Sequence, residues 1–138
     1  MIKNITYNNP EVQKEIDVLV GKSYTLIQRI KMKGTGSARH QIIECSSEIH
    51  ALLQLDNNTN VCSIEIRPRG VVIHFRSILE TFGWAIPYYK LSIYKTDQQH
   101  YSMHADQHKI MIKCSQHDFI KRIMDEKLNS SSPAPFEK

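Results

Sequence analysis

The chain has 138 residues, which is the size of one domain. Apolar residues make up 41% of it and charged residues 23%, which excludes a collagen-like, low-complexity or wholly disordered chain. A formal net charge of +4 suits either an anionic partner or an ordinary solvated surface. The basic residues are too dispersed for a dedicated nucleic-acid domain.

The sequence also indicates a compartment. The longest aliphatic runs have three residues, whereas a membrane span needs about 20 apolar residues. The N-terminus has no apolar stretch of signal-peptide length. Cys45, Cys62 and Cys114 form no C-x-x-C pair and stand in apolar patterns, so we expect free thiols packed in the core. We therefore expect a cytoplasmic protein in a reducing environment.

The first elements in chain order are a helix and a strand. The segment that opens with Asn9-Pro10 has apolar residues at helical spacing up to Gly21, which predicts a helix over 10–20. Apolar residues then alternate with mostly polar ones, which predicts a strand over 23–32. The glycines of segment 33–37 predict a flexible break.

The next segment, residues 39–54, fits two patterns. Apolar residues spaced four and three apart from Ala38 to Leu52 fit one face of a helix, and the absence of Gly and Pro favours it. The alternation from Ile49 to Leu55 fits a strand instead. We choose a helix over 39–54, and the strand stays open as the alternative.

From residue 61 to residue 114 the pattern is that of β-strands. Apolar and polar residues alternate in short runs that are separated by turns, so the segment predicts an antiparallel meander. One face of this sheet is apolar and must be covered. On that face we expect the core residues Trp84, Ile86, Leu91 and Ile93.

A last helix is predicted to cover the sheet. Ser115-Gln116-His117-Asp118 has the form of a capping signal, and amphipathic spacing follows it. Residues 129–138 are rich in Ser and Pro and predict a disordered tail. The sequence therefore predicts a single α+β domain over 1–128, in which an antiparallel β meander or barrel is closed by a C-terminal helix.

This order of elements resembles the pleckstrin-homology or GRAM-like barrel of bacterial binding modules, over about residues 61–128. Ile86-Pro87-Tyr88-Tyr89-Lys90-Leu91 is similar to the I-P-Y-x-x-I start of a barrel strand in such proteins, with leucine in the last place. Residues 63–95 also resemble short uncharacterised proteins of Bacteroidetes-type bacteria, a group that transfers no functional residues. A helix over 39–54 departs from the pleckstrin-like order and would suit a helix-grip-like fold with a ligand cavity.

Three arginines of one predicted hairpin suggest a binding surface. Arg67 and Arg76 point away from the apolar set, and Arg69 lies in the connecting turn. Because the guanidinium fork binds both oxygens of a phosphate or carboxylate, these residues predict an anion-binding patch. Its ligand would be a lipid head group, a nucleic-acid backbone or an acidic protein. The alternative is a solvated face on which Glu65 and Glu80 pair with the arginines.

A pair of histidines suggests a second site. His104 and His108 flank a predicted turn at Ala105-Asp106-Gln107 and would face each other across it. Imidazoles so placed can bind zinc, although exposed hairpin histidines are the plainer interpretation. The sequence contains no phosphate-binding loop, G-x-S-x-G or H-E-x-x-H motif, so we predict no catalytic residue and no cofactor.

Together these patterns predict a non-enzymatic module that binds a protein or an anionic ligand. The alternative is a small-molecule-binding or catalytic helix-grip-like domain with an internal cavity. The two interpretations differ at residues 39–54. As a helix this segment can roof a pocket, whereas as a strand it extends a barrel that side chains fill.

Overall fold

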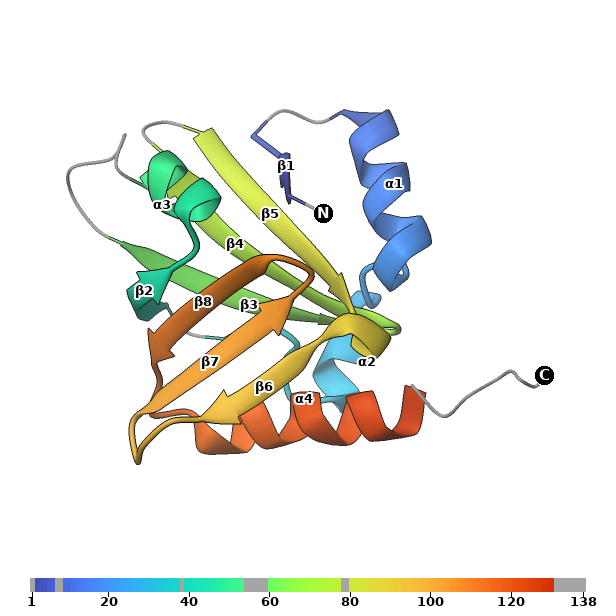
Figure 1. The fold of residues 1–138 in the computed structure, drawn as a ribbon. Coiled ribbons are helices and arrows are strands. Elements are labelled where there is room, and N and C mark those ends of the chain that lie inside the picture. The colour runs from blue at the N-terminus through green and yellow to red at the C-terminus, as the bar shows by residue number, and fades with distance from the viewer. Residues whose placement is uncertain (1, 7–8, 38, 54–59, 78–79, 131–138) are drawn as a thin grey trace.

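The computed structural model describes residues 2–6, 9–37, 39–53, 60–77 and 80–130. Within them the fold is α+β, with one open antiparallel sheet of eight strands (Figure 1). The strands are β1 (Ile2–Asn4), β2 (His40–Cys45), β3 (Val61–Arg67), β4 (Gly70–Ser77), β5 (Glu80–Pro87), β6 (Ser92–Lys95), β7 (His100–Ala105) and β8 (His108–Lys113). The helices are α1 (Pro10–Val20), α2 (Leu26–Lys31), α3 (Ser47–Leu53), the 3₁₀ turn η1 (Tyr88–Lys90) and α4 (His117–Ser130).

The sheet consists of two meanders. Strands β2 to β5 form one and β6 to β8 form the other, and the pairing of β2 with β8 joins them. In Figure 1 the second meander crosses in front of the first, so that their inner faces meet. The strand order begins with β1 and ends with β6, so the described sheet is open rather than a closed barrel.

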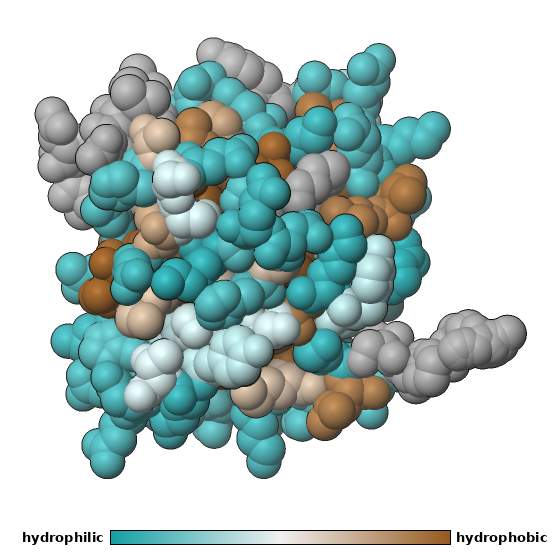
Figure 2. Space-filling view, in the orientation of Figure 1, coloured by the Kyte–Doolittle hydropathy of each residue, from teal (hydrophilic) through white to brown (hydrophobic). Residues whose placement is uncertain are grey.

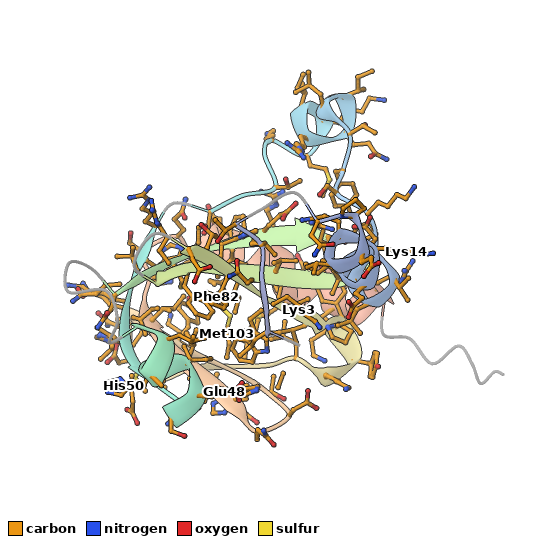
Figure 3. The ribbon with its side chains drawn as sticks, turned by 90° about the horizontal axis from the view of Figure 1, so that it is seen from above. Lys3, Lys14, Glu48, His50, Phe82 and Met103 are labelled. Carbon is orange, nitrogen blue, oxygen red and sulfur yellow. The ribbon has the colours of Figure 1, made fainter. Side chains whose placement is uncertain are left out.

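The main core lies between the two meanders. Trp84 and Ile86 come from the first meander and Met103 from the second, and all three side chains are fully buried. Figure 3 shows Phe82 and Met103 in this interior. The predicted core is confirmed for Trp84, Ile86 and Leu91, while Ile93 is partly buried and packs against the same cluster.

The outer face of the first meander is covered by α1. Ile16 and Val20 of this helix pack on Val72 and Ala85 of the sheet and form a second, smaller core. Residues that are adjacent in β4 therefore bury side chains on opposite faces, because both faces are covered. This burial on both faces explains why β4 has three consecutive apolar residues, Val71-Val72-Ile73.

Two predicted helices are confirmed. Asn9 caps α1 by accepting hydrogen bonds from two backbone N–H groups of its first turn, and Gly21 ends the helix at a φ of 90°. The C-terminal helix is α4, which continues to Ser130, two residues into the predicted tail. Residues 131–138 of that tail lie outside the described residues. In the part of the chain that the structure describes, no helix is both long and apolar enough to span a membrane.

The strand predicted over 23–32 is wrong, because the segment contains α2. Thr25 and Gln28 form a capping box in which each side chain accepts a hydrogen bond from the other's backbone N–H. This local signal fixes the start of a helix. Leu26 and Ile30 fit the alternation of a strand, but they also lie four residues apart on one helix face.

The helix predicted over 39–54 is wrong in its first half. Residues His40–Cys45 form β2, which pairs with β3 and β8, and only Ser47–Leu53 form a helix, α3. The strand alternative is correspondingly wrong for the α3 residues. Pairing with strands that are distant in the sequence decides the state of β2, and a local pattern does not carry this information.

Candidate functional site

Arg67, the first arginine of the predicted anion patch, is buried in an ionic network. Its side chain points to the outer face of β3, where Nε lies 2.9 Å from Glu65 Oε2 and Nη1 lies 3.1 Å from Asp17 Oδ1 of α1. The same Nη1 donates to the carbonyl of Gly21 at 2.9 Å. Arg67 is 5% exposed. Its charge is therefore compensated inside the protein and attaches α1 to the sheet.

Glu65 is the centre of this network. Its carboxylate also lies 3.2 Å from Nε2 of His74 and accepts a hydrogen bond from the hydroxyl of Ser23 at 3.1 Å. Burial raises the pKa of Glu65, but hydrogen bonds from His74 and Arg67, together with the Arg67 charge, outweigh burial and lower it to about 2. Glu65 is thus a fixed anion that holds two strands and the segment after α1.

The other two predicted arginines lie apart from each other. Arg69 is exposed, and its Nη2 donates to the Asp17 and Val18 carbonyls near the end of α1 at 3.2 and 3.1 Å. Arg76 is also exposed but lies at the opposite end of β4, roughly 20 Å along the strand from Gly70. The structure therefore does not bring the three arginines together at one site. For Arg67 the structure shows the alternative interpretation, pairing with Glu65.

Arg69 belongs instead to an open groove along α1, with a volume of about 650 Å³. Lys14 on the outer side of α1 (Figure 3) and Lys22 after it also line the groove. Its full lining is Pro10, Gln13, Lys14, Asp17, Val18, Gly21, Lys22 and Arg69. The one carboxylate among these residues is that of Asp17, which is ion-paired with Arg67. We call this electropositive surface the basic groove.

A charge pattern in the sequence points to this region. Residues 18–43 contain five Lys or Arg and no Asp or Glu. Since the whole chain has 18 basic and 14 acidic residues, the rest of it carries 13 against 14 and is close to neutral. The net positive charge is therefore concentrated in the segment that follows α1. A count of charge by segment would have found it, whereas the composition of the whole chain did not.

The same segment carries the most exposed apolar helix face that the structure describes. Leu26, Ile27 and Ile30 are 71%, 68% and 69% exposed, and α2 has no buried residue. Tyr24 and Met32, just outside α2, pack against the main core. Figure 3 shows α2 standing away from the body of the molecule. On the face shown in Figure 2, by contrast, hydrophilic residues predominate and apolar ones form separate patches.

The predicted histidine pair is not assembled. The hairpin turns at Asp106-Gln107, so that Ala105 pairs with His108 and His104 pairs with Lys109. His104 and His108 therefore project from opposite faces of the sheet, and the prediction that they face each other is wrong. Among the described residues, no three His, Cys, Asp or Glu side chains are placed to hold a metal ion.

His108 instead contacts the core. Its Nε2 lies 3.4 Å from Oε2 of Glu48 on α3, and its ring meets the Trp84 ring edge to face, with the centroids 5.8 Å apart. His108 Nδ1 and Trp84 Nε1 are buried and have no hydrogen-bond partner among the described residues. Two unpaired polar atoms in neighbouring rings are unusual, because such groups are normally satisfied by protein or water.

The thiols do not form a nucleophilic site. Cys114 Sγ lies 3.8 Å from Nε2 of His40, and both side chains are buried. Burial raises the pKa of Cys114 and, together with the neighbouring Cys114, raises the pKa of Cys62 to about 12. Burial also lowers the pKa of His40, which weakens it as a base. These thiols stay protonated near neutral pH, as expected of core cysteines.

Comparison with known proteins gives no relative. No protein-family model, no curated protein and no solved structure matches this chain. Function must therefore be argued from the chain's own geometry, of which the basic groove and the exposed face of α2 are the least explained by folding.

Proposed function

We propose that the protein is a non-enzymatic module that binds a phosphate-bearing anion in the basic groove. The observation that carries this proposal is the unbalanced charge of the groove. Lys14, Lys22 and Arg69 line it against a single carboxylate, that of Asp17, which is also ion-paired with Arg67 at 3.1 Å. An anion bound there would relieve the repulsion among three cations.

The chemistry of the groove suits phosphate esters. Lys14 and Lys22 are exposed and make no ion pair within the described ranges, so both ammonium groups can bind oxygen atoms. Arg69 has one nitrogen committed to the α1 carbonyls and still contributes its charge. Since the groove is open to solvent, binding is mainly electrostatic and weakens as salt rises.

We also propose that the fold is of the pleckstrin-homology or GRAM-like kind and that the protein is cytoplasmic. A meander of four strands, a meander of three and a C-terminal helix support this fold. Three free cysteines, two of them buried, support a reducing compartment. The basic groove lies on residues 10–22 and 69, so it is mostly outside the residues 61–128 that carry the resemblance.

The test is calorimetric titration with a soluble polyphosphate, inositol hexakisphosphate, at low and at high salt. We expect the parent to bind more weakly at high salt, and Lys14→Glu/Lys22→Glu to lose at least tenfold in affinity. The matched control is Lys95→Glu/Lys113→Glu, which changes the net charge equally at exposed positions on the second meander. The proposal fails if the parent does not bind or if both double variants lose affinity equally.

The unpaired nitrogens of Trp84 and His108 favour a second candidate function, the binding of a small polar molecule inside the protein. Such a molecule would supply the hydrogen bonds that Trp84 Nε1 and His108 Nδ1 lack. Native mass spectrometry of protein purified without denaturation would show its mass. A spectrum containing only the bare chain would remove this candidate.

A further inference from the structure

The exposed apolar face of α2 is not explained by folding. Leu26, Ile27 and Ile30 contribute nothing to either core, and each is about 70% exposed. A helix of six residues gains little stability from its own hydrogen bonds. Here the ends are fixed instead, by Tyr24 and Met32 in the main core and by the Arg122 hydrogen bond to the Gly34 carbonyl. The fold thus presents three apolar side chains to the exterior.

Cations surround this face. Arg29 and Lys31 lie on α2 itself, and Lys22 and Lys33 lie on either side of it. All four are exposed, and none makes an ion pair in the part of the chain that the structure describes. A surface that matches α2 must therefore be apolar and carry negative charge.

Two carboxylates of α4 lie on one side of this region, whereas the Glu65 carboxylate near Ser23 is paired with Arg67. Asp125 and Glu126 line a cavity of about 240 Å³ together with Met32, Ile66 and Arg122. A negatively charged surface would be repelled from that side. On the other side, Lys22 lines the basic groove and stands four residues before Leu26, so a short stretch of chain joins the groove to α2. In Figure 3 α2 stands apart from α1, and residues 21–25 connect the two helices.

The small size of the face distinguishes between two kinds of partner. In a stable protein complex each partner contributes roughly 20–30 residues, whereas α2 offers three apolar side chains. A lipid interface needs no such area, because shallow insertion of a few apolar side chains adds to the attraction between cations and anionic head groups.

We propose that α2 inserts its apolar face into an anionic membrane surface while the basic groove binds the lipid head groups. This inference rests on the proposed function and names its ligand as the phosphate of an anionic lipid. Apart from Arg69, the residues that carry the site lie within 14–33, outside the region that resembles pleckstrin-homology domains. The protein would thus bind the membrane peripherally through two weak contacts that act together.

The test measures partition onto vesicles by sedimentation. One set of vesicles contains phosphatidylcholine alone, and the other contains phosphatidylcholine with phosphatidylserine. We expect the parent to bind the second set, to bind less as salt rises, and to bind the first set at least tenfold more weakly. In parallel, titration with inositol hexakisphosphate reports on the groove without a membrane.

Leu26→Gln/Ile30→Gln separates the two contacts. We expect this variant to lose about tenfold or more in vesicle binding and to keep the affinity of the parent for inositol hexakisphosphate. The matched control is Ile43→Gln/Leu128→Gln, which removes two exposed apolar side chains elsewhere and should bind as the parent does. Circular dichroism and thermal melting of each variant confirm that it is folded.

The outcomes that overturn membrane binding by α2 differ from those that overturn anion binding in the basic groove. If the parent binds the soluble polyphosphate but not the vesicles, or if Leu26→Gln/Ile30→Gln binds vesicles as the parent does, the membrane inference is overturned and the groove stands. If the parent binds neither, both are overturned. Self-association of the parent that the α2 variant abolishes would identify a second copy as the partner and would also overturn the inference.

Discussion

Glu65 and Arg67 are separated by one residue, lie on one face of β3 and are linked to three other segments of the chain. The Arg67 side chain reaches Asp17 of α1, and Glu65 reaches His74 of β4 and the Ser23 hydroxyl. A buried ion pair of this kind gives little net stability relative to apolar side chains, but the loss of one partner is costly because the other charge stays buried. The pair therefore fixes where α1 docks more than it stabilises the fold.

The low pKa of Glu65 makes part of the stability depend on pH. The folded carboxyl titrates at about 2, below the ordinary value of 4.5, so the unfolded chain takes up its proton first as the pH falls. The ionised Glu65 carboxylate therefore adds about 3 kcal/mol to the free energy of unfolding. This contribution is complete above about pH 4.5 and is lost as the pH falls through about 2. Urea unfolding of the parent and of Glu65→Gln should give free energies that converge over this range. A difference that stays constant with pH would contradict the assignment.

At the scale of elements, the β3–β4 turn shows how closely α1 approaches the sheet. A Cβ added at Gly70 would meet the carbonyl oxygen of Ile86 and would lie 2.6 Å from Val20 Cγ1 and 2.8 Å from the Pro87 Cα. Two of these contacts are with the backbone of β5, which cannot move aside without breaking its pairing with β4. Only glycine lets helix and strand meet here.

Gly70→Ala should therefore destabilise the protein by about 1–3 kcal/mol or more, because the added methyl overpacks the junction of α1, β4 and β5. The matched control is Gly36→Ala. A Cβ at Gly36 has no atom within 4 Å, so this variant should stay within about 0.5 kcal/mol of the parent. Urea unfolding measures both. Equal stability of the two variants would show that the junction can relax and that the close approach is not required.

Local signals account for which elements the sequence predicted correctly. Helix α1 has a cap, a proline and a terminal glycine, and apolar residues recur at every second position in the strands from β3 onward, so short-range patterns suffice. The strand prediction for residues 23–32 is wrong because their apolar residues fit both the helix period and the strand period. The Thr25–Gln28 capping box favours the helix. The helix prediction for the β2 residues is wrong for a different reason. Their strand conformation depends on pairing with β8, which lies more than 60 residues away in the sequence.

The candidate site was predictable only in part, for the same reason. The pairing of Arg67 with Glu65, which the sequence offers as the alternative to an anion patch, follows from their spacing of two residues on a strand. The docking of α1 on Arg67 joins residues 50 positions apart, and no local pattern reveals it. That contact removes Arg67 from the predicted anion patch. It also pairs Asp17 with a buried cation, while Lys14, Lys22 and Arg69 outnumber the one carboxylate of the groove that binding is proposed to use.

At the scale of the whole molecule, the main core is shared by both meanders. It contains Ile64 and Trp84 from the first and Met103 and Ile110 from the second, all nearly or fully buried. Separating the meanders would expose both inner faces at once. We therefore expect the chain to unfold as a single cooperative unit, in keeping with the single domain predicted from its length.

Two buried thiols, one in each meander, can report on this cooperativity. Cys62 lies on β3 and Cys114 directly follows β8; both are almost fully buried, and burial raises the pKa of each. In a Cys45→Ser background, both should be alkylated by iodoacetamide at the same slow rate and with the same dependence on urea, because each becomes reactive only on global unfolding. Met103→Ala in the second meander should cost about 2–5 kcal/mol and accelerate both reactions equally. If it accelerates only the reaction of Cys114, the two meanders open independently.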